Sequence, residues 1–294
     1  MQQRALISTG TLFALPALAG LLIFVAAPFL LAIGLAFTNL RLGSPLPLEF
    51  VGLKNFVRLF DDPAFTRALL NNFTFTVVMV PLQTLLALVL ALLLNQPLRG
   101  QAVFRALFFM PVIFPLSLVA VVWILIFAPG PSGTLNGFLQ YISFGYWQPQ
   151  DFLHDPWLAL PAIMLTSIWQ GVGFQMVILL AGLQGIPQQL YEAASIDGAG
   201  RWQTFWNVTL PQLRNTLIFV MLMTTILAFR LFEQVQIMTY GGPRHATTTV
   251  MYEAVQAAFT RQQIARGAAI TVIFFLLVLV VTAFQRHVAR QEHA

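Results

Sequence analysis

Residues 192–211 read EAASIDGAGRWQTFWNVTLP, and they stand between two long apolar runs at 157–183 and 213–238. The stretch begins with helix-forming residues, is interrupted at Gly198-Ala199-Gly200 and closes with Leu210-Pro211. A glycine after a helix commonly takes the left-handed conformation that ends it, and a proline is tolerated in a helix's first turn. The pattern predicts two short helices joined at a glycine, held outside the membrane by two spans.

The rest of the chain has the composition of a membrane protein. Of its 294 residues 58% are hydrophobic and 9% are charged, whereas a soluble domain is about 25% charged. A membrane helix needs roughly 20 apolar residues in succession. Six runs satisfy this, at Thr11–Phe37, Leu70–Leu94, Val103–Phe127, Trp157–Leu183, Leu213–Met238 and Ala268–Phe284. We therefore expect an all-α membrane protein of six transmembrane helices in a single domain, residues 1–294.

The first run also has a feature of cleaved signal peptides, the small residues Ala17-Leu18-Ala19. Its apolar core is longer than the 7–15 residues of a signal peptide, which favours a permanent helix. Six spans place both termini on one side of the membrane. The connections and termini on each side of the membrane carry seven Lys and Arg residues. The positive-inside rule therefore does not decide whether the termini are inside or outside.

Several function classes are excluded by what the sequence lacks. The net charge is +5, but the basic residues are scattered rather than clustered, which argues against nucleic-acid binding. There are no cysteines, the four histidines lack metal-ligand spacing, and the only lysine, Lys54, is in GLKNF. A Walker A lysine is therefore absent, and no catalytic motif of an intramembrane enzyme is present. We expect neither an enzyme nor a bound cofactor or metal in this chain.

The segment 185–211 has two possible roles as an elbow between the fourth and fifth spans. Pro187 can begin its first helix, and the second helix carries Trp202, Phe205 and Trp206 on one face. Such a face suits either a connector lying on lipid or a knob that docks on a partner protein. Glu192 and Asp197 favour the partner, since an anionic membrane surface prefers Lys and Arg.

A few polar residues within the spans are candidates for a solute path, because charges and amides in a membrane are costly and usually functional. Arg230 and Glu233 are three residues apart in the fifth span and could neutralise each other on one helix face or line the path. Gln170 and Gln175, with Trp169 beside them, are second candidates in the fourth span. Hydrogen bonding of these glutamines between helices is the alternative.

The elbow resembles the E-A-A-x3-G-x9-I-x-L-P motif of permease subunits of bacterial ATP-binding-cassette importers. Here the motif residues are Glu192, Ala193, Ala194, Gly198, Leu210 and Pro211, with Val208 in place of the isoleucine. FVGLKNFVRLFDDPAF (50–65), SGTLNGFL (132–139), SIWQGVGFQMVILLAGLQGIPQQLYEAASIDGA (167–199) and MTYGGPRHATTTV (238–250) resemble the carbohydrate-uptake branch. The chain is most similar to the first permease of a maltose- or glycerol-phosphate-type heterodimer, without extra N-terminal spans or a large periplasmic insert.

The resemblance implies a membrane subunit that moves a carbohydrate or polyol across the bacterial inner membrane by alternating access. It implies a second permease subunit, an ATPase dimer that binds ATP and Mg²⁺, and a periplasmic or lipid-anchored solute-binding protein. The elbow and both termini would be cytoplasmic, with Asp197 among the coupling residues, and segments 39–69, 128–156 and 239–267 would face outward. A passive channel and an intramembrane enzyme are the alternative functions.

Overall fold

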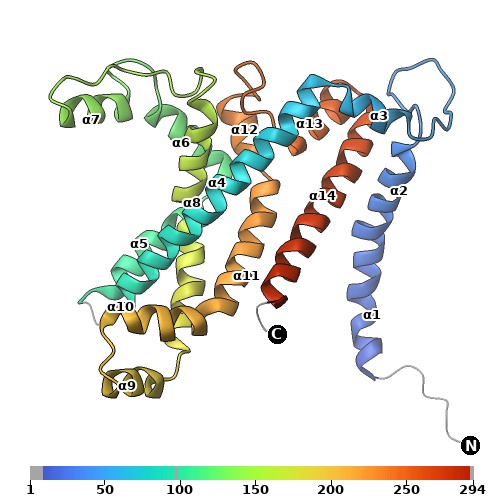
Figure 1. Ribbon diagram of the computed structural model, residues 1–294. Helices are drawn as coiled ribbons and strands as arrows, with labels where there is room; N and C mark the ends of the chain where they lie inside the picture. The colour runs from blue at the N-terminus through green and yellow to red at the C-terminus, as the bar shows by residue number, and fades with distance from the viewer. Residues whose placement is uncertain (1–8, 97–98, 292–294) are drawn as a thin grey trace, which may run out of the picture. The chain divides into compact units, whose positions relative to one another are not determined.

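The computed structural model describes residues 9–96 and 99–291, and its helices follow the expected runs (Figure 1). In this part of the chain the regular elements are helices, apart from an isolated bridge between Thr38 and Phe50. Arg4 and both chain ends, which bear on the expected orientation, lie outside the described residues. The chain divides into two compact units, residues 1–63 with 253–276 and residues 64–252 with 277–294, and we describe each by itself.

Among the described residues, five helices are long and apolar enough to cross a membrane: Phe13–Ala36, Pro63–Leu94, Ala159–Gln184, Arg201–Phe229 and Ile264–His287. A sixth candidate is the pair α5 (Gln101–Ile113) and α6 (Leu116–Ile126), which are bent by 100° at a short break. The predicted third span, Val103–Phe127, corresponds to this bent pair of helices. Pro115 explains the break, since a proline disfavours helical conformation in the residue before it, and Phe114 is extended with ψ 139°.

The first unit contains α1 (Thr9–Leu21), the π-helical segment η1 (Leu22–Ala26), α2 (Ala27–Ala36) and α3 (Lys54–Phe60). It also holds the end of α13 (Val250–Val255), η3 (Gln256–Thr260) and the first half of α14 (Ile264–Gln291). Phe29 packs on Phe275, with ring centroids 4.7 Å apart. Segment 39–69 contains α3, which ends at Phe60, and the start of α4 at Pro63.

Charged residues hold the connections of this first unit together. Glu253 is 2% exposed and accepts a bond of 2.6 Å from Arg261. Arg266 pairs with Asp62 and lies 3.6 Å from Glu253. The carboxylate of Glu253 is therefore buried with its charge compensated, as a buried charge must be.

The second unit is built around α4 (Pro63–Leu94), α8 (Ala159–Gln184) and α11 (Leu210–Phe229). One buried cluster joins α4 and α6 with α8 and the short helix α12 (Glu233–Met238), and includes Phe75, Phe127 and Ile163. A second cluster joins α4, α8 and α11, and includes Ala87, Met176 and Leu213. The two clusters fix the helices at successive levels and leave room between them for polar residues.

The loop between α12 and α13 is attached to α4 by two buried asparagines. Asn71 donates to the carbonyls of His245 and Thr248 at 2.8 and 2.9 Å. Asn72 donates to the Phe229 carbonyl at 3.4 Å and accepts from the Val250 amide at 2.7 Å. These bonds hold the end of α11, next to Arg230, and the start of α13 against α4.

A short helix, α7 (Thr134–Ile142), lies in the Gly- and Pro-rich segment between α6 and α8. Asn136 organises this segment, since its side chain bonds the Gln150 backbone and the Trp147 ring. In Figure 1, α7 and α12 lie at one end of the second unit, and α9 (Gln188–Ile196) and α10 (Arg201–Thr204) lie at the other.

Candidate functional site

The first helix of the elbow, α9, ends at a glycine in the way the sequence predicts. Gly198 has φ +74°, in the left-handed region. The Ala199 amide donates to the Ala194 carbonyl at 2.9 Å, and the Gly198 amide donates to the Ser195 carbonyl at 3.1 Å. These two bonds form a Schellman motif, which satisfies carbonyls that the helix end leaves free. The expected left-handed turn at Gly198 is confirmed.

The second helix of the elbow does not end before the fifth span. Residues Arg201–Phe229 form one helix that includes α10, the π-helical segment η2 (Phe205–Thr209) and α11. Pro211 lies in the first turn of α11, where its missing amide costs little because η2 replaces the regular bonding. The helix therefore continues through Pro211, and the second half of the elbow is joined to α11 without a break.

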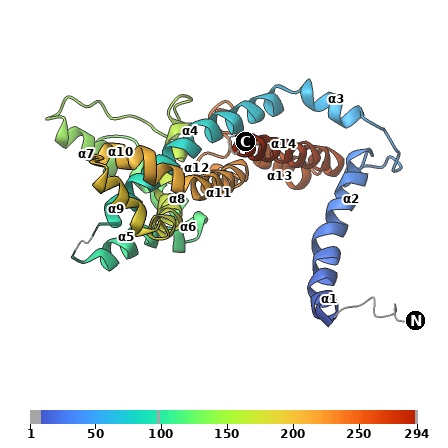
Figure 2. The same ribbon diagram turned by 60° about the horizontal axis from the view of Figure 1, so that its bottom comes forward.

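The two elbow helices lie side by side in both views of the molecule (Figures 1 and 2). The Tyr191 hydroxyl is 3.3 Å from the Thr209 hydroxyl, which links α9 to η2. Ala194 is 9% exposed. Glu192, Ala193 and Asp197, by contrast, are exposed. The family motif thus divides between one buried residue that holds the elbow together and an outer surface.

The aromatic stripe of the elbow is present and partly uncovered. The rings of Trp202 and Trp206 are 5.6 Å apart, edge to face, and Phe205 stacks beside Trp202 at 6.0 Å. Phe205 also packs against the cluster of α4, α8 and α11. Trp202 remains 71% and Trp206 50% exposed. An uncovered aromatic surface of this kind favours a partner or lipid contact.

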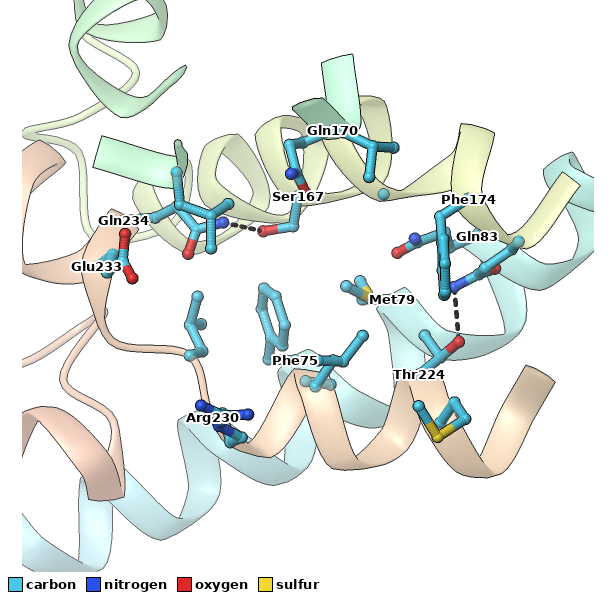
Figure 3. Close-up of a pocket in the computed structure, with 18 of the residues that line it drawn as sticks. Phe75, Met79, Gln83, Ser167, Gln170, Phe174, Thr224, Arg230, Glu233 and Gln234 are labelled. Carbon is cyan, nitrogen blue, oxygen red and sulfur yellow. Dashed lines mark hydrogen bonds between the residues drawn. The ribbon is translucent and has the colours of Figure 1, made fainter. Parts of the chain in front are cut away.

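A cavity of about 490 Å³ lies within the second unit, among α4, α8 and α11 (Figure 3). Its volume is in the range of small-molecule sites, about 300–1,000 Å³. Phe75, Met79 and Phe174 form much of its apolar wall. The polar lining residues are Gln83, Ser167, Gln170, Gln175, Thr224, Arg230, Glu233 and Gln234. Four of the five predicted path residues thus line one cavity.

Arg230 and Glu233 do not form the pair that their spacing predicted. Helix α11 ends at Phe229, and Glu233 begins α12, so the two residues lie on different helices. The break separates their side chains, and within the described residues no ion pair joins them. Both side chains are exposed and line the cavity. The prediction of mutual neutralisation on one helix face was wrong.

The other three predicted path residues have different surroundings. Gln175 is 4% exposed and its amide donates to the Thr224 hydroxyl at 2.6 Å, so it bonds between α8 and α11 while it lines the cavity. Gln170 lines the cavity without such a bond in the described part. Trp169 points elsewhere, since its ring packs edge-on against Trp123 with centroids 5.7 Å apart. Trp169 is not among the lining residues, because successive side chains of a helix point in different directions.

Four polar lining residues were missed by the sequence analysis, namely Gln83, Ser167, Thr224 and Gln234. Gln234 donates to the Ser167 hydroxyl at 3.2 Å and so joins α12 to α8. Gln83, on α4, is 3% exposed. A glutamine inside the apolar run of 70–94 was a visible signal, because buried amides in membrane helices are uncommon and usually have a purpose.

Comparison with known proteins agrees with this architecture. The family model described as "binding-protein-dependent transport system inner membrane component" matches residues 62–292. The chain is 34% identical to the probable ABC transporter permease protein YurN of Bacillus subtilis, covering 93% of each chain. It is also 34% identical to the sulfoquinovosyl glycerol transport system permease protein SmoG of Agrobacterium fabrum, covering 94% of this chain and 89% of SmoG.

A solved structure has the same fold. It is a crystal structure of a bacterial alginate ABC transporter in complex with an alginate pentasaccharide-bound periplasmic protein. One of its chains superposes with a TM-score of 0.82 at 23% identity, covering 95% of this chain and 93% of that one. The family match covers most of the chain, as do both relatives, and the six candidate membrane helices agree with a multi-pass protein. The chain belongs to the family of binding-protein-dependent transport system inner membrane components.

Proposed function

We propose that this chain is one of two membrane-spanning subunits of an ATP-driven importer that takes up a carbohydrate or related polyol by alternating access. One observation carries the proposal: a polar cavity and an exposed elbow are connected by the same helix, Arg201–Phe229. Thr224 lines the cavity near one end of this helix, and Trp202 is exposed near the other. A rigid helix between two such sites can couple events at one to events at the other.

The elbow is the docking site for a partner ATPase in this proposal, and it faces the cytoplasm together with both termini. Its exposed surface includes Glu192, Ala193 and Asp197 and the aromatic rings of Trp202 and Trp206. Interfaces are enriched in such aromatic residues. ATP and Mg²⁺ bind in the ATPase, because this chain has no Walker A lysine. Closure of the ATPase moves α9 and α10, and η2 passes the movement to α11.

The cavity is the solute path in this proposal. It combines amide, hydroxyl and charged groups with the faces of Phe75 and Phe174, a combination that suits hydroxyl-rich rings with apolar faces. SmoG is named for the transport of a sulfoquinovosyl glycerol, and the solved transporter was determined with an alginate-bound periplasmic protein. Both support a carbohydrate as the solute here. A second permease subunit and a solute-binding protein complete the importer, and the segments at the α7 and α12 end face that protein.

Reconstitution tests the proposal. The chain is purified together with its second permease and ATPase, placed in liposomes, and supplied with the solute-binding protein and a panel of radiolabelled sugars. We expect accumulation of a sugar that requires ATP and is abolished by a non-hydrolysable analogue. Uptake that runs down the gradient without ATP would instead identify a passive channel, and chemical conversion of the sugar would identify an enzyme.

A further inference from the structure

The end of the cavity away from the charged residues carries a feature that the proposed path alone does not require. Figure 3 shows Arg230, Glu233 and Gln234 at one end and Gln83, Phe174 and Thr224 at the other. Gln83 and Gln175 line the latter, the amide end, and both are more than nine-tenths buried, at 3% and 4% exposed. Two amides from α4 and α8 therefore meet a common cavity.

Each of these amides has a carbonyl oxygen without a hydrogen-bond partner in the described part of the chain. Gln175 uses its amide nitrogen on Thr224, and its oxygen accepts nothing. The oxygen of Gln83 is likewise buried and unpartnered. Native structures seldom leave buried acceptors unsatisfied, because each costs roughly 1–3 kcal/mol. Both oxygens lie beside one end of one cavity but have less than 1 Å² of accessible surface, so a donor that the protein does not supply reaches them only when the side chains around them move.

Gly171 gives Gln83 access to this end of the cavity. A Cβ added at Gly171 would lie 2.4 Å from the amide nitrogen of Gln83 and 3.4 Å from its amide carbon. Any larger residue at 171 would therefore force the Gln83 amide away. Gly171 itself lines the cavity, so the amide of Gln83 lies against the backbone of α8 at the wall of the cavity.

We propose that Gln83 and Gln175 form a subsite that accepts hydrogen bonds from hydroxyl groups of a polyhydroxylated solute, and that Gly171 is required to admit Gln83. The inference rests on the proposed function, because it assigns part of the solute path. Hydroxyl groups match the two free acceptors, since a hydroxyl donates one hydrogen and can still accept from the Gln83 amide nitrogen. The subsite selects for hydroxyls at one position of the solute, independently of Arg230 and Glu233.

The test uses the reconstituted complex with saturating binding protein and the sugar that the wild type transports. Uptake of that sugar is compared with uptake of each of its monodeoxy analogues. The ratio of the two rates is measured for the wild type, Gln83→Leu, Gly171→Ala and the double variant. Comparing ratios between variants cancels the selectivity of the binding protein. Gln184→Leu, an exposed change at the end of α8 outside the cavity lining, is the matched control.

We expect the wild type and Gln184→Leu to reject at least one deoxy analogue by about three- to tenfold, the value of one neutral hydrogen bond. That ratio should fall to about one in Gln83→Leu and Gly171→Ala, and the double variant should equal Gln83→Leu. If Gln83→Leu does not assemble, Gly171→Ala still tests the subsite, because it keeps the glutamine and displaces it.

An unchanged ratio in Gln83→Leu or Gly171→Ala would overturn the inference while wild-type uptake leaves the proposed function intact. A double variant that is worse than Gln83→Leu would show that Gly171 serves helix packing and not Gln83. If the wild-type complex takes up no carbohydrate with ATP, the proposed function fails and the subsite fails with it.

Discussion

Replacing Gly198 tests whether the elbow depends on its left-handed turn. Gly198 has φ +74°, and an added Cβ would meet no atom within 4 Å. The cost of a side chain is therefore the backbone strain alone, and no clash contributes. For an L-residue the left-handed conformation costs roughly 1–2 kcal/mol, and a β-branched residue is the least suited to it. Asparagine tolerates the conformation and should cost least.

These costs convert into populations of the turn. Since 1.4 kcal/mol is tenfold in an equilibrium constant, Gly198→Val should lower the population of the Schellman turn roughly five- to thirtyfold relative to competing conformations. The exposed face of α9, with Glu192 and Ala193, would then no longer have the orientation that docks on the ATPase. We expect uptake to fall in the order glycine, asparagine, alanine, valine, while membrane abundance stays constant because the spans are untouched.

The assay measures ATP-dependent uptake and co-purification of the ATPase for the four proteins, normalised to membrane abundance. Gly200→Ala is the control, because Gly200 has φ −70° and an added Cβ would lie 3.8 Å from the Gln203 side-chain oxygen, an ordinary contact. Full transport by Gly198→Val, or equal losses in Gly198→Val and Gly200→Ala, would refute the reasoning.

Three further predictions concern the partner surface, the cavity and the fold. In the proposed complex Glu192 pairs with an Arg or Lys of the ATPase. Glu192→Lys should therefore keep normal membrane abundance but lose ATPase co-purification by roughly thirtyfold or more, since breaking a buried interfacial charge pair costs about 2–5 kcal/mol. Wild-type stoichiometry in moderate salt would contradict this pairing. Arg230→Gln and Glu233→Gln should change uptake independently, so that the fold-change of the double variant is the product of the two single fold-changes, because the residues are unpaired. If a single variant loses membrane abundance and the double variant regains it, the two residues form a structural pair. Asn72→Ala leaves the Val250 amide and the Phe229 carbonyl without their bonds. The free energy of unfolding of the purified protein should therefore fall by about 1–3 kcal/mol or more, measured by thermal denaturation. A loss no larger than that of the exposed control Asn95→Ala would contradict the role given to Asn72.

The apolar runs were enough to predict the helices, because length and hydrophobicity decide whether a helix can span a membrane. The left-handed turn at Gly198 was also predictable, since the residues that end a helix are neighbours in the sequence. The sharp bend between α5 and α6 was not predictable from Pro111 and Pro115, because membrane helices often tolerate proline without bending sharply.

The cavity was only partly predictable. Arg230, Glu233, Gln170 and Gln175 stood out as polar residues in apolar runs, and all four line it. Their relative placement was not predictable, because the end of α11 is bonded to Asn72, more than 150 residues away in the sequence. Trp169 was chosen for its proximity to Gln170 in the sequence, but neighbours on a helix point in different directions.

The central claim is that solute passes through the cavity of this chain while an ATPase acts on its elbow. A structure of the assembled importer, determined with the transported sugar bound, tests this most directly. The account predicts sugar density between α4, α8 and α11, in contact with Gln83 or Arg230, and an ATPase surface that covers Glu192 and Ala193. Sugar bound only in the second permease, or an elbow that lies uncovered or against lipid, would contradict it.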